Sequence, residues 1–174
     1  VLVGMVDVVM VAAVGEAAVS GVSLVDSINM LIIQMLAALA TGGAVVSAQF
    51  VGRKDMDKAC RAAAQLISVT TIASVGLMAF ALITNRHLLG MVFGKVEEDV
   101  MENAAVYFAI TAASYPFLAL YNSCAALYRS MGNSKISMKV SIIMNLINVV
   151  GNALCIFVLH MGVEGVAYPT LVSR

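Results

Sequence analysis

The sequence predicts an all-α membrane protein, and three observations lead to this fold class. Apolar residues make up 61% of the 174 residues and charged residues only 11%, whereas about a quarter of a soluble domain is charged. The mean hydropathy is +0.98. The apolar residues also fall in long blocks, which is typical of membrane spans. Such spans must be helical, because an open strand in lipid would leave backbone groups unpaired.

Six apolar segments are expected to form helices. The first, residues 1–14, and the sixth, residues 163–174, are each part of a span, and we therefore interpret the chain as a piece of a longer protein. The four segments between them exceed the roughly 20 residues that cross about 30 Å of hydrocarbon, and they comprise residues 23–50, 59–83, 104–127 and 136–159. Pro116 interrupts the fourth segment and is expected to kink it.

The connections between the segments alternate in charge. The two basic connections carry Arg53, Lys54, Lys58 and Arg61 after the second segment, and Arg129, Lys135 and Lys139 after the fourth. The connections near Gly15 and residues 160–164 hold no Lys or Arg, and the one after the third segment is mainly acidic. The positive-inside rule then places both basic connections in the cytoplasm. We expect a multi-pass protein of a bacterial cell membrane.

The composition argues against several classes of function. The formal net charge is zero, and no basic cluster alternates with aromatic residues, so we expect no nucleic-acid partner. Three widely spaced cysteines and two histidines do not predict a metal site or a disulfide framework. No nucleophile–base pair is apparent. We therefore expect neither an enzyme nor a bound cofactor.

Asp7 is the most informative polar residue. It lies eight residues before Gly15, or about 12 Å along a helix, which is close to the middle of the apolar layer. A carboxylate there costs about 2.5–3.5 kcal/mol, and apart from Arg61 and Lys139 at the ends of their segments, Arg174 is the only basic residue inside an expected span. Asp7 could form a structural ion pair, or it could take up a proton or a cation. We favour the second interpretation.

Three asparagines of the fifth segment, Asn145, Asn148 and Asn152, share one helix face because they are spaced i, i+3, i+7. Asn152 and Thr170 each lie eight residues from a turn, at the same expected depth as Asp7. These groups could simply join helices by hydrogen bonds. Their common depth favours a site around Asp7 instead.

A second line of the same spacing, on the second segment, consists of Ser27, Met30 and Gln34, with Asp26 beside it. Such a line could border a cavity for amphipathic molecules, because methionine adapts to varied ligands. A packing interface between helices would give the same pattern.

Five stretches match, in order and spacing, the signatures of one transporter family. They are residues 6–11 with 14–18, 48–53, 128–133, 148–152 and 162–165. In these stretches the chain resembles the multidrug and toxic compound extrusion (MATE) transporters, and the resemblance covers essentially the whole chain.

The resemblance implies a protein of twelve helices in two six-helix lobes. Residues 1–174 would form the first lobe, with its first and sixth helices truncated and the second lobe outside this chain. Such proteins export cationic and amphipathic drugs in exchange for inward Na⁺ or H⁺. The residues that the resemblance assigns to the coupling ion are Asp7, Asn148, Asn152, Thr170 and Tyr107.

Two other functions fit the same sequence. A flippase of lipid-linked oligosaccharides, from the same superfamily, would need a basic cavity for pyrophosphate, which these spans do not supply. A non-transporting membrane scaffold would have a dry, closed lobe and no second set of six helices.

Overall fold

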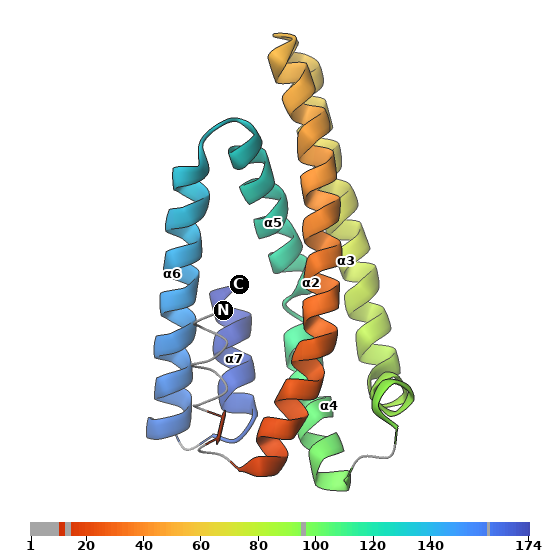
Figure 1. Cartoon of the computed structure of the whole chain (residues 1–174), viewed down its shortest axis with the longest axis vertical. Helices are drawn as coiled ribbons and strands as arrows, with labels where there is room; N and C mark the ends of the chain where they lie inside the picture. The colour runs from red at the N-terminus through yellow and green to blue at the C-terminus, as the bar shows by residue number, and fades with distance from the viewer. Residues whose placement is uncertain (1–10, 13–14, 95–96, 160) are drawn as a thin grey trace.

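The computed structural model describes residues 11–12, 15–94, 97–159 and 161–174, so Asp7 lies outside the described residues. In the described ranges every regular element is a helix, which confirms the all-α class. Figure 1 shows these elements as a bundle of roughly parallel and antiparallel helices. They are α2 (Glu16–Gly52), α3 (Met56–Phe93), α4 (Glu98–Ala112), α5 (Tyr115–Ser130), α6 (Ser134–Ala153), the π-helix η1 (Leu154–Val158) and α7 (Glu164–Ser173).

Helices α2 and α3 form a long antiparallel hairpin that rises above the rest of the bundle (Figure 1). They contain 37 and 38 residues, respectively. Relative to the expected segments 23–50 and 59–83, α2 begins seven residues earlier and α3 ends ten residues later. The difference arises because a helix ends where its backbone is capped or broken, and not where its hydropathy falls.

The tip of this hairpin is a tight turn in which Asp55 caps α3. The Asp55 carboxylate accepts a hydrogen bond from the Lys58 backbone N–H at 3.2 Å and pairs with the Lys58 ammonium at 2.8 Å. The hydrogen bond from the Lys58 side chain holds the pKa of Asp55 below its ordinary value. Lys54 closes the turn in the left-handed conformation, at φ 59°. With Arg53 also exposed, the tip is strongly basic.

The expected fourth helix, residues 104–127, is broken into α4 and α5. The two helices meet at Ala113 and Ser114 and are bent by 48°. Pro116 lies in the first turn of α5, where a missing N–H leaves no helical hydrogen bond unmade. The proline therefore starts a second helix and does not kink a continuous one. The Ser114 hydroxyl closes the break by donating to the Thr111 carbonyl at 2.6 Å.

Helix α6 runs into the π-helical turn η1, so the expected segment 136–159 contains two kinds of helix. Helix α7 packs against both α6 and α4. At Gly151 of α6, an added Cβ would lie 2.7 Å from Cβ of Pro169 in α7. Glycine is therefore what allows these two helices to approach so closely.

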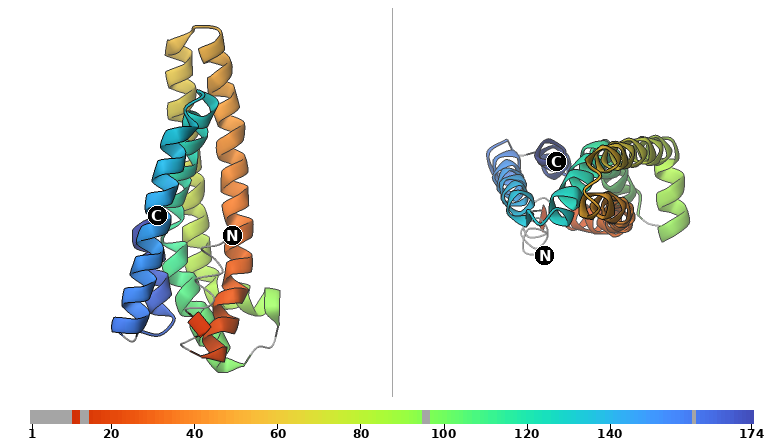
Figure 2. Two further views of the ribbon diagram at one scale, coloured as in Figure 1. Left: turned by 60° about the vertical axis from the view of Figure 1, so that its left-hand side comes forward. Right: turned by 90° about the horizontal axis from the view of Figure 1, so that it is seen from above.

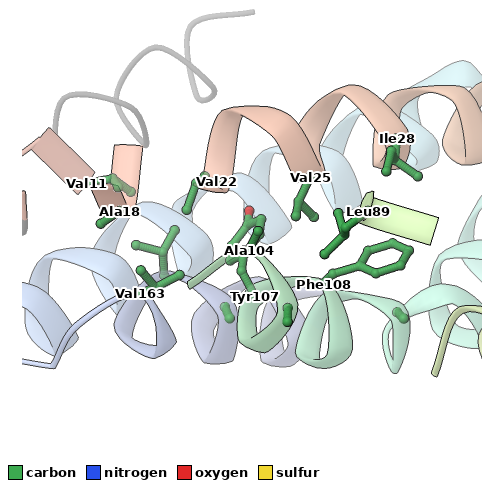
Figure 3. Packing of buried hydrophobic residues seen from close by; sticks show 14 of the residues in the cluster. Val11, Ala18, Val22, Val25, Ile28, Leu89, Ala104, Tyr107, Phe108 and Val163 are labelled. Atoms are coloured by element: carbon green, nitrogen blue, oxygen red, sulfur yellow. The ribbon is translucent and has the colours of Figure 1, made fainter. Parts of the chain in front are cut away.

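The main apolar core joins α2, α3, α4 and α7. Figure 3 shows Val25 of α2 near Leu89 of α3 and Phe108 of α4, and all three are almost fully buried. Large apolar side chains also face outward, among them Leu31 at 73% and Ile83 at 84% exposure. A surface of this kind is typical of helices that face lipid or another part of a membrane protein.

Among the described residues, three helices are long and apolar enough to cross a membrane, and a fourth span results if α4 and α5 are counted together. In Figure 1 the α2–α3 tip and the α5–α6 turn lie toward the same end of the bundle. The two basic connections are therefore at one end, as the charge pattern predicts. Figure 2 shows α6 and α7 to one side of the α2–α3 hairpin, with α5 between them.

We expect Gly151→Ala to lower the stability of the full-length protein by about 1–3 kcal/mol, because the new methyl group would overpack the contact with the rigid Pro169 ring. The measurement is the Tm of the purified protein in detergent. Gly76 is the control, because a Cβ added there would have nothing within 4 Å of it. Gly76→Ala should leave the Tm unchanged or raise it slightly. Equal Tm values for the two variants would contradict the packing.

Candidate functional site

A cavity of about 320 Å³ lies between α2, α4, α5, α6 and α7. Both faces of this cavity carry polar side chains, although the surrounding lobe is mainly apolar. The principal polar groups are Asp26, Tyr107, Tyr121, Asn145, Asn148 and Thr170, with Arg174 at the end of α7. Polar and ionisable groups in membrane-type helices are costly and mark functional sites by default. This cavity is therefore the candidate site.

One wall of the cavity is a chain of hydrogen bonds between α6 and α7. The Asn148 amide donates to the Thr170 hydroxyl at 3.1 Å, and the Asn152 amide donates to the Asn148 carbonyl oxygen at 3.3 Å. The Thr170 hydroxyl in turn donates to the Val166 carbonyl at 2.8 Å. All these side chains are buried. Asn148 and Asn152 are one helical turn apart, so their spacing along α6 aligns them for this contact.

The opposite wall is held by hydrogen bonds between α2 and the broken α4–α5 pair. The Tyr107 hydroxyl donates to Asp26 Oδ1 at 3.2 Å. One turn further along α2, the Asn29 amide donates to the Thr111 hydroxyl at 3.3 Å and its carbonyl oxygen accepts from the Tyr115 hydroxyl at 2.7 Å. Asp26 and Asn29 thus form a polar stripe on the face of α2 that meets α4 and α5.

Arg174 brings a positive charge to the same cavity. Its guanidinium Nη1 donates to the Ser114 hydroxyl at 3.0 Å, at the break between α4 and α5. Arg174, which follows α7, lies beside the α4–α5 break, and its side chain reaches the cavity from there. Arg174 is the only Lys or Arg among the described residues that line the cavity, and Asp26 lines it too, so the cavity is not basic overall.

The predicted site residues fall into three groups. Tyr107, Asn145, Asn148 and Thr170 line the cavity, and Asn152 is hydrogen-bonded to Asn148 behind it. Asp7 lies outside the described residues, so its predicted place beside them stays a prediction. The third group consists of the second-segment residues Ser27, Met30 and Gln34.

Ser27, Met30 and Gln34 do not line this cavity. All three are exposed on α2, and the Ser27 hydroxyl donates to the Ser23 carbonyl of its own helix at 3.0 Å. Asp26 is exposed too, but it accepts a hydrogen bond from Tyr107, and Asn29 of the same stripe is buried against α4. Each residue turns an α-helix by about 100°, so the neighbouring stripe of Ser27 points away from these contacts. Both stripes have polar residues at helical spacing, so spacing alone could not show which stripe lines the cavity.

Three further residues line the cavity: Asp26, which the sequence only placed beside the Ser27 line, and Tyr121 and Arg174, which it did not predict as site residues. For Asp26 the available signal was its i, i+3 spacing to Asn29, since two polar residues on one face of an apolar helix need polar partners. No comparable signal exists for Tyr121 and Arg174. Their place in the cavity depends on the bend between α4 and α5 and on the packing of α7.

The cavity and fold can be compared with known proteins. The family model of MatE matches residues 1–154. The chain belongs to the MatE family. It is 30% identical, over 178 aligned residues, to the uncharacterized transporter YisQ of Bacillus subtilis (strain 168), and 26% identical, over 162, to the probable multidrug resistance protein YpnP of the same organism.

These alignments cover 98% and 93% of the chain but only 38% and 35% of the two relatives. This MatE chain therefore spans little more than a third of the length of the curated relatives that it matches. A MATE crystal structure in the bent conformation superposes with a TM-score of 0.92 at 24% identity, over 99% of this chain and 38% of that one.

An inward-facing multidrug resistance MATE family transporter gives a TM-score of 0.91 at 26% identity, over 99% of this chain and 39% of that one. The match to both structures confirms the predicted fold, which is the N-terminal lobe of a MATE-type membrane transporter.

We expect Thr170→Val to lower the stability of the full-length MatE protein by about 0.5–1.5 kcal/mol, because the buried Asn148 amide would lose its acceptor on α7. The Tm in detergent measures this effect. Thr41→Val is the matched control, because the Thr41 hydroxyl is exposed and donates only to the Ala37 carbonyl of its own helix, at 2.8 Å. A Tm loss of the same size in both variants would show that the interhelical contact is not the cause.

Proposed function

We propose that the protein containing this MatE lobe exports cationic and amphipathic small molecules in antiport with Na⁺ or H⁺, and needs no cofactor besides the coupling ion. The observation that carries this proposal is the cavity, in which a carboxylate, tyrosine hydroxyls and asparagine amides meet inside an apolar helix bundle. The similarity to a probable multidrug resistance protein supports the same substrate class.

The coupling step is assigned to Asp7 together with Asn148, Asn152, Thr170 and Tyr107. Amide and hydroxyl oxygens are suitable ligands for hard cations, and the Asn148–Thr170 pair presents such groups at the cavity wall. A proton or Na⁺ taken up by Asp7 from outside would change the charge of the lobe and favour drug release. A ligand shifts such an equilibrium only through its different affinity for the two states.

Alternating access then requires the second lobe, which lies outside this chain. In related transporters of many folds, two repeats rock around a central site near the membrane midplane. We place the protein in a bacterial cell membrane with the basic α2–α3 tip in the cytoplasm, because positive loops stay on that side. The outward-facing apolar surface of the helices would then contact lipid and the other lobe.

A flippase for lipid-linked oligosaccharides is the second candidate, and Arg174 is the observation that favours it. A guanidinium in a cavity is a good partner for phosphate groups. Asp26 lines the same cavity, however, and offsets this charge. A single offset guanidinium makes a poor site for pyrophosphate, so we prefer the exporter. The cavity of about 320 Å³ also differs from the dry, closed lobe expected of a scaffold.

We expect Asp7→Asn to reduce ion-driven export of an ethidium-like dye by about tenfold or more, because a coupling free energy of 1–3 kcal/mol corresponds to factors of about 5–150. The measurement is dye movement in proteoliposomes that contain the full-length protein, under a Na⁺ or H⁺ gradient. Asp57→Asn is the control, because Asp57 is exposed near the hairpin tip, and it should leave the rate unchanged. Export by Asp7→Asn at the wild-type rate would refute the assigned role.

A further inference from the structure

The cavity contains two opposite charges that come from different helices. Asp26 lies on α2, and Arg174 follows α7. Among the described residues that line the cavity, these two are the only Asp, Glu, Lys or Arg side chains. The cavity is therefore dipolar, and the position of a charged ligand in it depends on both groups.

Each of the two charged groups has a neutral hydrogen-bond partner on the α4–α5 pair. The Tyr107 hydroxyl holds Asp26 at 3.2 Å, and the Ser114 hydroxyl holds Arg174 at 3.0 Å. Tyr107 and Ser114 are seven residues apart, or about two helical turns along the chain. These two hydroxyls help to hold the charged groups at different points along the α4–α5 pair.

The surroundings of Asp26 suit an organic cation. A carboxylate has two oxygens that accept about four hydrogen bonds, so the Tyr107 contact leaves Asp26 able to accept donors from a ligand. The rings of Tyr107 and Tyr121 also line the cavity, and aromatic rings attract ammonium groups. Met144 adds a flexible apolar wall that can adapt to ligands of different shape.

We propose that Asp26 binds the cationic nitrogen of an organic ammonium substrate and that Arg174 repels a second positive charge, so that the cavity selects monocations over dications. This inference rests on the proposed export function and names the substrate class within it. Two unit charges on the order of 10 Å apart, at an effective dielectric constant of about 20, interact strongly enough to change an equilibrium constant by roughly tenfold.

Ethidium and propidium test this proposal, because they share one ring system and carry one and two positive charges, respectively. Their initial export rates and KM values are measured with the full-length protein in proteoliposomes. The wild type should prefer ethidium by about tenfold. Asp26→Asn should raise the KM for ethidium about tenfold, whereas Arg174→Gln should reduce the preference for ethidium over propidium by a similar factor.

Two charge-conserving variants are the controls. Asp26→Glu should keep the KM for ethidium near the wild-type value, and Arg174→Lys should keep the preference between the two dyes. A dye preference unchanged by Arg174→Gln would overturn the role of Arg174, and an unchanged KM for ethidium in Asp26→Asn would overturn that of Asp26. If Asp26→Asn does not fold, the Arg174→Gln result alone decides the selectivity.

The same dyes separate this inference from the proposed function. Binding of each dye to detergent-solubilised full-length protein, followed by fluorescence polarisation, requires no ion gradient. Dye binding with the expected charge preference but no ion-driven export would refute the antiporter and support the site. Export by the wild type without any charge preference would support the antiporter and refute the site.

Discussion

The lobe depends on the pairing of polar side chains between helices that are otherwise apolar on nearly every face. Helical backbones satisfy their own hydrogen bonds in a membrane, and apolar side chains pack equally well against lipid and protein. Burial of apolar area alone therefore does not fix how each helix is rotated about its axis. Here the contacts of Asp26 and Asn29 with α4 and α5, and of Asn148 with Thr170, provide that rotational information. The same contacts form the walls of the cavity, so the structure of the lobe and its binding site have one physical origin.

Much of this arrangement follows from the sequence. Long apolar blocks predicted the helical class, and the alternation of basic connections predicted which helix ends lie together. The asparagine stripe on α6 predicted a polar face, and the structure places Asn148 of this stripe in contact with Thr170. These inferences succeeded because each depends on spacing within one helix and on distance from a turn. Both quantities can be counted along the chain. The predicted site around Asp7 stays a prediction.

The rest depends on contacts between distant segments. The carboxylate of Asp26 meets Tyr107 across 81 positions of the sequence, and Arg174 meets Ser114 across 60. No periodicity within α2 distinguishes the stripe of Asp26 from that of Ser27, because apolar residues surround both. The break at Ser114 could not be predicted from the sequence either, since Pro116 is compatible with a kinked helix and with the start of a new one. Tertiary packing decided each case.

The bend between α4 and α5 has a mechanical consequence. The bend of 48° is held by backbone hydrogen bonds from Ala113 to Ala109 and from Ser114 to Thr111. The guanidinium of Arg174 donates to Ser114 at this break, and Pro169, five residues earlier in α7, packs against Gly151 of α6. A change in the angle between α4 and α5 would therefore act on α7 through Arg174 and on the asparagine stripe of α6 through Pro169 and Thr170. The α4–α5 break, through the contacts of Arg174 and of the α2 residues Asp26 and Asn29, thus connects the α2 side of the lobe to the α6 side.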